Sequence, residues 1–186
     1  MRQNGDTFAA EYFRQGSPAN STFAESCNRL LAGSDLAIAA TGVELAVGVP
    51  LQAGDVITNI TFVTGGTAAV TPTAGYAVLR DSAGAKLAQT ADFGSTARAA
   101  NTAYTVALTA AYTVTAAGLF MIGISFTAAT IPTLRGASLA NATLAGALGV
   151  SAAVLTRTHG AAVGAVAPAT VATPTTVFAV PYVIGT

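Results

Sequence analysis

The hydrophobic pattern of the chain changes near residue 36. From Leu36 onward apolar and polar residues alternate with a period of two, and Gly, Pro, Asn and Asp separate runs rich in Val, Thr, Ile, Tyr and Phe. This pattern is typical of half-buried β-strands joined by turns. We count about seven to nine such runs, which predicts an all-β fold, an antiparallel β-sandwich or jelly roll.

The alternation is clearest in six segments. They are residues 56–63, 76–79, 87–90, 104–109, 120–126 and 176–184. In the first segment Val56, Ile60 and Phe62 are predicted to share the buried face. Residues 80–86 are polar and carry a glycine, which predicts a hairpin loop between the second and third segments. Pro181 lacks a backbone donor and should place the last segment at a sheet edge or split it.

Residues 1–35 have a different character, with few Val or Ile and several aromatic and charged residues. Asp6 could cap a short helix, and Thr22 followed by Glu25 fits a capping box for a second helix that ends at Gly33. On that second helix Phe23, Cys27, Leu30 and Leu31 would share one face. We therefore predict an N-terminal arm over residues 1–35 that contains short helices, followed by a sandwich domain over residues 36–186.

Between Pro132 and Pro174 the alternation fades into Ala, Gly, Thr and Pro. A stretch of this length without secondary structure is uncommon in a compact domain. We expect that it combines a concealed strand with a functional loop that a partner orders.

The composition favours association and disfavours nucleic-acid binding. Charged residues make up 9% of the chain and hydrophobic residues 52%, so much of the surface must be Ala, Thr, Ser and Gly. The formal net charge is +0, and the basic run that a nucleic-acid binder needs is missing. All acidic residues precede residue 93. This asymmetry is either compositional drift or a sign that identical subunits stack head to tail.

We expect neither a disulfide within the chain, nor a signal peptide, nor a membrane span. Cys27 is the single cysteine, so it cannot form a disulfide within the chain and is interpreted as a small core residue. Apolar residues do not follow Arg2 as in a signal peptide. Residues 136–156 are uncharged and long enough to cross a bilayer, but they are mostly Ala, Gly, Ser and Thr. We predict no membrane span.

The sequence lacks the usual constellations of catalytic residues. His159 is the single histidine, and no acidic residue follows Asp92, so a local triad cannot form. Nucleophile-elbow, phosphate-loop and paired-histidine zinc motifs are missing as well. We predict a non-enzymatic protein without cofactor or metal, in which His159 is a loop residue. A cell-wall hydrolase, with His159 beside a distant carboxylate, remains an alternative.

Other candidate binding residues have simpler structural interpretations. The carboxylates that could pair for glycosidase chemistry are Asp35, Glu44, Asp55, Asp81 and Asp92. Asp55 and Asp81 occupy turn positions, where bonds to nearby backbone amides explain them. Sugar binding often uses exposed aromatic platforms, and without Trp the candidates are Tyr76, Tyr104 and Tyr112, of which Tyr104 is assigned to the core.

Three stretches together resemble a β-sandwich domain of actinobacteriophage virion proteins. They are residues 75–90 (GYAVLRDSAGAKLAQT), 112–123 (YTVTAAGLFMIG) and 132–136 (PTLRG), within a similarity that spans roughly residues 50–186. The resemblance implies a structural role on the particle, as a capsid decoration protein, a head fibre or a minor tail protein. It brings no catalytic residues.

We therefore expect a structural virion protein, assembled in the bacterial cytoplasm, that packs on the shell through its N-terminal arm. The aromatic residues Phe8, Tyr12, Phe13 and Phe23 are the predicted interface. The expected partners are the major capsid protein or tail proteins of the same virion, and further copies of the chain, for example in a trimer. A minor tail protein that binds a receptor or host-surface glycan, and an exported adhesin, are the alternatives.

Overall fold

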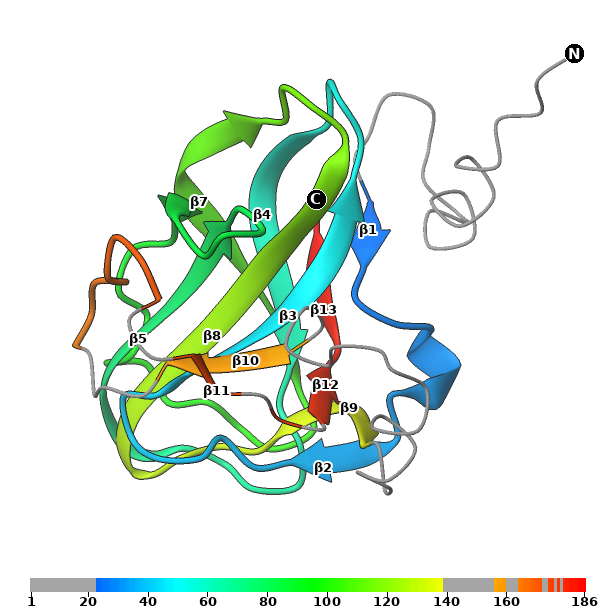
Figure 1. Cartoon of the computed structure of the whole chain (residues 1–186). Helices are drawn as coiled ribbons and strands as arrows, with labels where there is room; N and C mark the ends of the chain where they lie inside the picture. The colour runs from blue at the N-terminus through cyan, green and yellow to red at the C-terminus, as the bar shows by residue number, and fades with distance from the viewer. Residues whose placement is uncertain (1–22, 139–155, 160–163, 172–173, 176, 178) are drawn as a thin grey trace, which may run out of the picture.

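The computed structural model describes residues 23–138, 156–159, 164–171, 174–175, 177 and 179–186, and it is an all-β antiparallel sandwich (Figure 1). One short 3-10 helix, η1 (Arg29–Leu31), interrupts the strands. The strands are β1 (Ala24–Glu25), β2 (Ser34–Leu36), β3 (Glu44–Leu51), β4 (Val56–Val63), β5 (Val70–Arg80), β6 (Lys86–Gln89), β7 (Ala103–Thr113), β8 (Gly118–Thr130), β9 (Leu134–Ser138), β10 (Thr156–His159), β11 (Pro174–Thr175), β12 (Ala179–Pro181) and β13 (Val183–Gly185).

The strands form three sheets. The largest has the order β11-β10-β3-β8-β5-β6, and the second has the order β1-β13-β4-β7. A small sheet, β12-β9-β2, joins the second sheet through a bridge between Thr64 and Leu134. In Figure 1, β3 and β8 cross in front of β4, so the two larger sheets form the layers of the sandwich.

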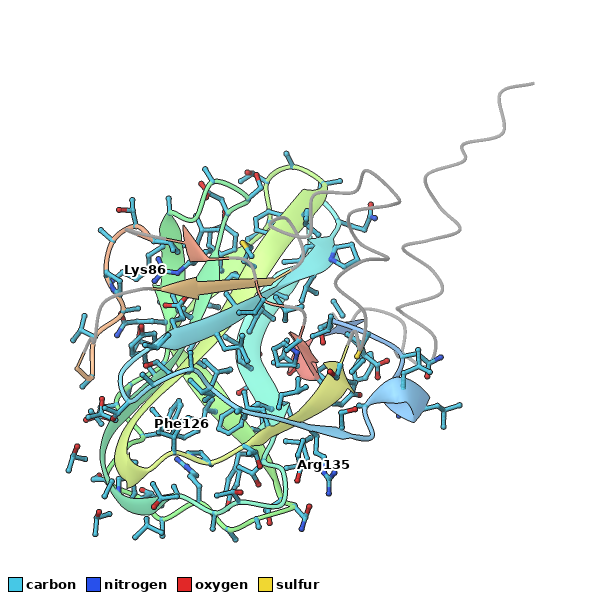
Figure 2. All side chains as sticks on the ribbon, turned by 60° about the horizontal axis from the view of Figure 1, so that its bottom comes forward. Lys86, Phe126 and Arg135 are labelled. Atoms are coloured by element: carbon cyan, nitrogen blue, oxygen red, sulfur yellow. The ribbon has the colours of Figure 1, made fainter. Side chains whose placement is uncertain are left out.

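The core lies between the six-stranded and the four-stranded sheets. Alternate residues of β3, β5 and β8 point into it and meet Ile57, Ile60 and Phe62 of β4. The largest aromatic group contains Phe62, Phe93 and Phe126, with ring centroids 5.5–5.7 Å apart. Figure 2 shows Phe126 in the interior of the fold. The alternation predicted for residues 104–109 is confirmed. In residues 120–126 the predicted inward residues do lie in the core, but their neighbours are buried as well, because β8 is covered on both faces.

The predicted face of β4 is wrong at its first residue. Ile57 is fully buried, whereas Val56 is 41% exposed. The register against β7 shifts between Ile57 and Asn59, because the amides of Thr58 and Asn59 both donate to the Thr186 carbonyl oxygen at 2.6 Å. This bulge exchanges the two faces of the strand, so Ile57 joins Ile60 and Phe62 in the core.

The turns and the chain end follow the predictions closely. β5 and β6 form the hairpin expected around residues 80–86. The last segment is split as expected, because β12 ends at Pro181 and β13 begins at Val183 in a different sheet. Within the stretch after Pro132, β9, β10 and β11 are strands that the fading alternation concealed.

Candidate interaction site

At the start of the described part of the chain, strand β1 is hydrogen-bonded to β13, near the C-terminus. β1 pairs with β13, with Ala24 opposite Gly185 and Glu25 opposite Ile184. The Ser26 hydroxyl donates to the Pro181 carbonyl at 2.7 Å and accepts from the Val183 amide at 3.0 Å. We call residues 23–32 the root of the N-terminal segment, because they fix where that segment leaves the sandwich.

A buried carboxylate, that of Glu25, stabilises the root. The Glu25 Oε1 atom accepts hydrogen bonds from the Tyr182 hydroxyl at 2.7 Å and from Arg29 Nη2 at 2.5 Å. Burial, and then the hydrogen bond to Glu25, raise the pKa of Tyr182 well above its usual range. The Arg29 guanidinium also lies over the ring of Phe23, 5.6 Å from its centroid. One carboxylate therefore links β1, η1 and the chain end.

The tip of the root presents apolar side chains to solvent. Asn28 caps η1 through its side-chain oxygen, which accepts from the Leu30 amide at 2.9 Å. Leu30 is 88% exposed and its neighbour Leu31 is 66% exposed. Figure 1 shows η1 protruding at the right of the molecule. Two adjacent exposed leucines on a capped turn are typical of a contact surface rather than of a core.

The predicted second helix is wrong in the part of the chain that is described. Ala24 and Glu25 belong to a strand, and only one short 3-10 turn follows them. Main-chain pairing with β13, together with the Ser26 bonds, outweighs the local helical signal. Phe23 is half-buried at the root, whereas Phe8, Tyr12 and Phe13 lie outside the described residues. Strands β1 and β2 also place residues 24–25 and 34–36 within the sheets, although the predicted arm extended to residue 35.

Cys27 lies half-buried within the root rather than in the core. Burial raises the pKa of its thiol, and the Glu25 carboxylate adds to this effect. A thiol with a raised pKa is mostly protonated at neutral pH and is a weak nucleophile. Cys27 is therefore a packing residue of the root.

The most deeply buried charges lie on the outer face of the six-stranded sheet, away from the root. Arg80 donates from Nε and Nη2 to the two oxygens of Glu44, both at 2.8 Å, in a bidentate ion pair. The Tyr76 hydroxyl donates to Glu44 Oε2 at 3.0 Å. Burial, and then the charge of Glu44, raise the pKa of Tyr76 well above its usual range. The carboxylate is thus fully bonded, which is the requirement for burying it.

Gly123 makes this ion pair geometrically possible. It lies on β8 between Ala46 of β3 and Val78 of β5, so the Glu44–Arg80 pair passes over it. A Cβ atom at this position would lie 2.2 Å from Glu44 Oε1. The close approach of a side chain therefore requires glycine here.

Residues 164–171, which we call the strap, cover part of the same face. Ala167 is buried against Tyr76 and Val78. Arg80 Nη1 donates to the Pro168 carbonyl at 3.0 Å, and Lys86 Nζ donates to the Ala167 carbonyl at 3.0 Å. Figure 2 shows Lys86 on the side of the molecule opposite Arg135, and Figure 1 shows the strap in orange beside β5. The strap and the ion pair together form a sealed structural unit.

The remaining candidate carboxylates have structural roles. The Asp55 side chain accepts from the Gln52 amide at 2.7 Å, and Asp81 accepts from the Ala83 and Ala85 amides at 3.0 and 2.8 Å. These contacts confirm the turn roles predicted for both residues. Asp92 accepts from the amides of Gly75 and Gly94, and Asp35 pairs with Arg135 at 2.9 Å. These partners account for each carboxylate without catalysis.

The backbone of His159 lies in a strand, and none of the three candidate tyrosines is fully exposed. The backbone of His159 is in β10, paired with β11, so its predicted placement in a loop is wrong. Tyr76 is fully buried. The Tyr104 ring is only half-buried and lies beneath the guanidinium of Arg98, which is 4.6 Å from the ring centroid. Tyr112 is half-buried, with its ring 6.3 Å from that of Phe120.

Within the described ranges, acidic, His and Cys residues do not gather into a group of three that could hold a metal ion. The described part of the chain also lacks a helix long and apolar enough to cross a membrane. Comparison with known proteins returned no matching family model, no matching curated protein and no matching solved structure.

Proposed function

We propose that this chain is a structural protein of a bacteriophage virion, a capsid decoration or head-fibre protein that attaches to the shell through its N-terminal segment. The observation that carries the proposal is the root. It is fixed to the sandwich by β-pairing and by Glu25, and it exposes Leu30 and Leu31 next to the segment that carries Phe8, Tyr12 and Phe13.

A chain segment that becomes ordered on binding a partner loses conformational entropy. A fixed starting point with a preformed apolar contact beside it reduces this cost of attachment. Aromatic and leucine side chains provide most of the apolar area that such an interface buries. The bonded roles of Glu44, Arg80 and the turn aspartates favour a structural protein over an enzyme.

The test is co-sedimentation of the full chain with particles that lack it. Deletion of residues 1–22, and separately the change of Leu30 and Leu31 to Ser, should each reduce bound protein at least tenfold. Val166→Ser is the matched control, because Val166 is 64% exposed on the strap, away from the root. Undiminished binding of both the deletion variant and the leucine variant would overturn the proposal. Binding to tails instead of shells would reassign the chain to a minor tail protein.

A further inference from the structure

The four-stranded sheet has an outer face that no described segment covers. Its centre is formed by Thr61, Val63, Ala103, Thr105, Ala107 and Ile184, which point away from the core. None of the residues in the described strands β4, β7 and β13 is charged. At the margin, Glu25 is already paired with Arg29. We call this surface the uncharged face.

Four threonine hydroxyl groups on and around the uncharged face are hydrogen-bonded within the chain. Thr61 and Thr105 share a hydrogen bond of 2.7 Å between their hydroxyl oxygens. Thr58 donates to the Thr186 carbonyl at 3.0 Å, and Thr109 donates to the Gln89 carbonyl at 2.9 Å. Burial of a polar group is costly mainly when it loses a partner, and these groups keep theirs. The face can therefore be covered at little cost in desolvation.

We infer that a second copy of this chain covers the uncharged face, sheet against sheet. A partner with a charged surface would bury its charges against a face that supplies no counter-charge, which is unfavourable. A second copy presents the same charge-free, pleated surface, and sheets of this kind stack about 10 Å apart. The net charge of +0 also means that two copies do not repel each other.

The size of the face sets the expected strength of the contact. With a rise of about 3.4 Å per residue and about 4.8 Å between strands, β13, β4 and β7 present roughly 360 Å². Two copies would then bury about 700 Å², which is the size of a weak, transient contact. We therefore expect a reversible dimer that forms only at high micromolar or higher concentration.

Sedimentation equilibrium of the full chain over about three decades of concentration tests this inference. Ala107→Lys places a charge on the uncharged face, at an exposed side chain that has no hydrogen bond to lose. It should raise the dissociation constant of the dimer at least tenfold. Ser82→Lys, at an exposed position in the β5–β6 loop, should leave the constant unchanged.

The experiment distinguishes a dimer formed through the uncharged face from association through the N-terminal segment. Circular dichroism and thermal melting establish that both lysine variants are folded. A wild-type chain that stays monomeric throughout would overturn the inference. So would association that persists in Ala107→Lys but disappears when residues 1–22 are deleted. The inference does not depend on the proposed function, because it requires no particle.

Discussion

The outer faces of the two large sheets differ in which polar groups they carry and in whether the chain covers them. On the six-stranded sheet the face carries Glu44 and Arg80, and the strap covers the part of it around them. On the four-stranded sheet the face carries threonine and alanine, and no described segment covers it. Charges on a sheet face must be solvated, or paired and fully bonded, whereas a face of internally bonded hydroxyls is stable either way. One layer is therefore sealed by its own chain, and the other stays available for contact.

Disruption of the Glu44–Arg80 ion pair on the six-stranded sheet should reduce stability more than any other change described here. Arg80→Ala leaves Glu44 buried without its counter-charge and removes the bond to the strap, so the free energy of unfolding should fall by about 3–5 kcal/mol. Urea denaturation followed by circular dichroism measures it. Arg135→Ala is the control, because its ion pair with Asp35 is partly exposed and should be worth no more than about 1 kcal/mol. Equal losses in the two variants would contradict the account.

The second change probes the space under the ion pair. In Gly123→Ala the new methyl group meets the Glu44 carboxylate, and repacking should cost about 1–3 kcal/mol of unfolding free energy. Gly118→Ala on the same strand is the control, since its Cβ would meet only the Phe120 ring at 4.0 Å. The same denaturation experiment compares the two variants. If Gly123→Ala is no less stable than Gly118→Ala, the ion pair does not occupy the position described.

A pH titration compares buried phenols on both sides of the molecule. The folded state raises the pKa values of Tyr76 and Tyr182, so above about pH 10 the unfolded chain releases protons that the folded chain retains. The stabilisation is therefore complete below pH 10 and is lost as the pH rises further. Denaturation midpoints between pH 8 and 11 measure this effect. The variant with Phe at both positions should show a flatter decline, and an unchanged slope would contradict the assignment.

Substitutions on the uncharged face should have the smallest effect on the free energy of unfolding. Thr105→Val removes the shared hydroxyl bond with Thr61 at an exposed position, and it should alter the unfolding free energy by no more than about 0.5 kcal/mol. Differential scanning calorimetry at low protein concentration is sensitive enough to measure this. A loss of more than about 1.5 kcal/mol would mean that the face contributes to folding rather than to contact.

The sequence predicted those parts of the fold that depend on neighbouring residues. Alternation gave the faces of β7 and β8, and the polar, glycine-containing residues 80–86 gave the β5–β6 hairpin. The exchange of Val56 and Ile57 could not be predicted, because the bulge depends on the carbonyl of Thr186, far along the chain. The root could not be predicted either, because its strand pairs with β13 at the opposite end of the sequence.

The buried Glu44–Arg80 ion pair was harder to predict from the sequence than the strands were. Glu44 was recognised as a candidate carboxylate, but its partners Arg80 and Tyr76 lie on another strand, brought near it by the pairing of β3 and β5 with β8. A glycine within an otherwise apolar run, Gly123, was the available signal of a close approach. Phe23 alone among the predicted interface residues lies in the described part, and its partner Arg29 is within the same short segment.

The most direct measurement is an electron cryo-microscopy structure of the full chain bound to its particle. The account predicts that the shell contacts the root, with Leu30 and Leu31 covered, and that a second copy covers Thr105 and Ala107. The strap should remain closed over Tyr76 and Arg80. A structure in which the root and the uncharged face both point to solvent, while the strap side contacts the particle, would contradict it.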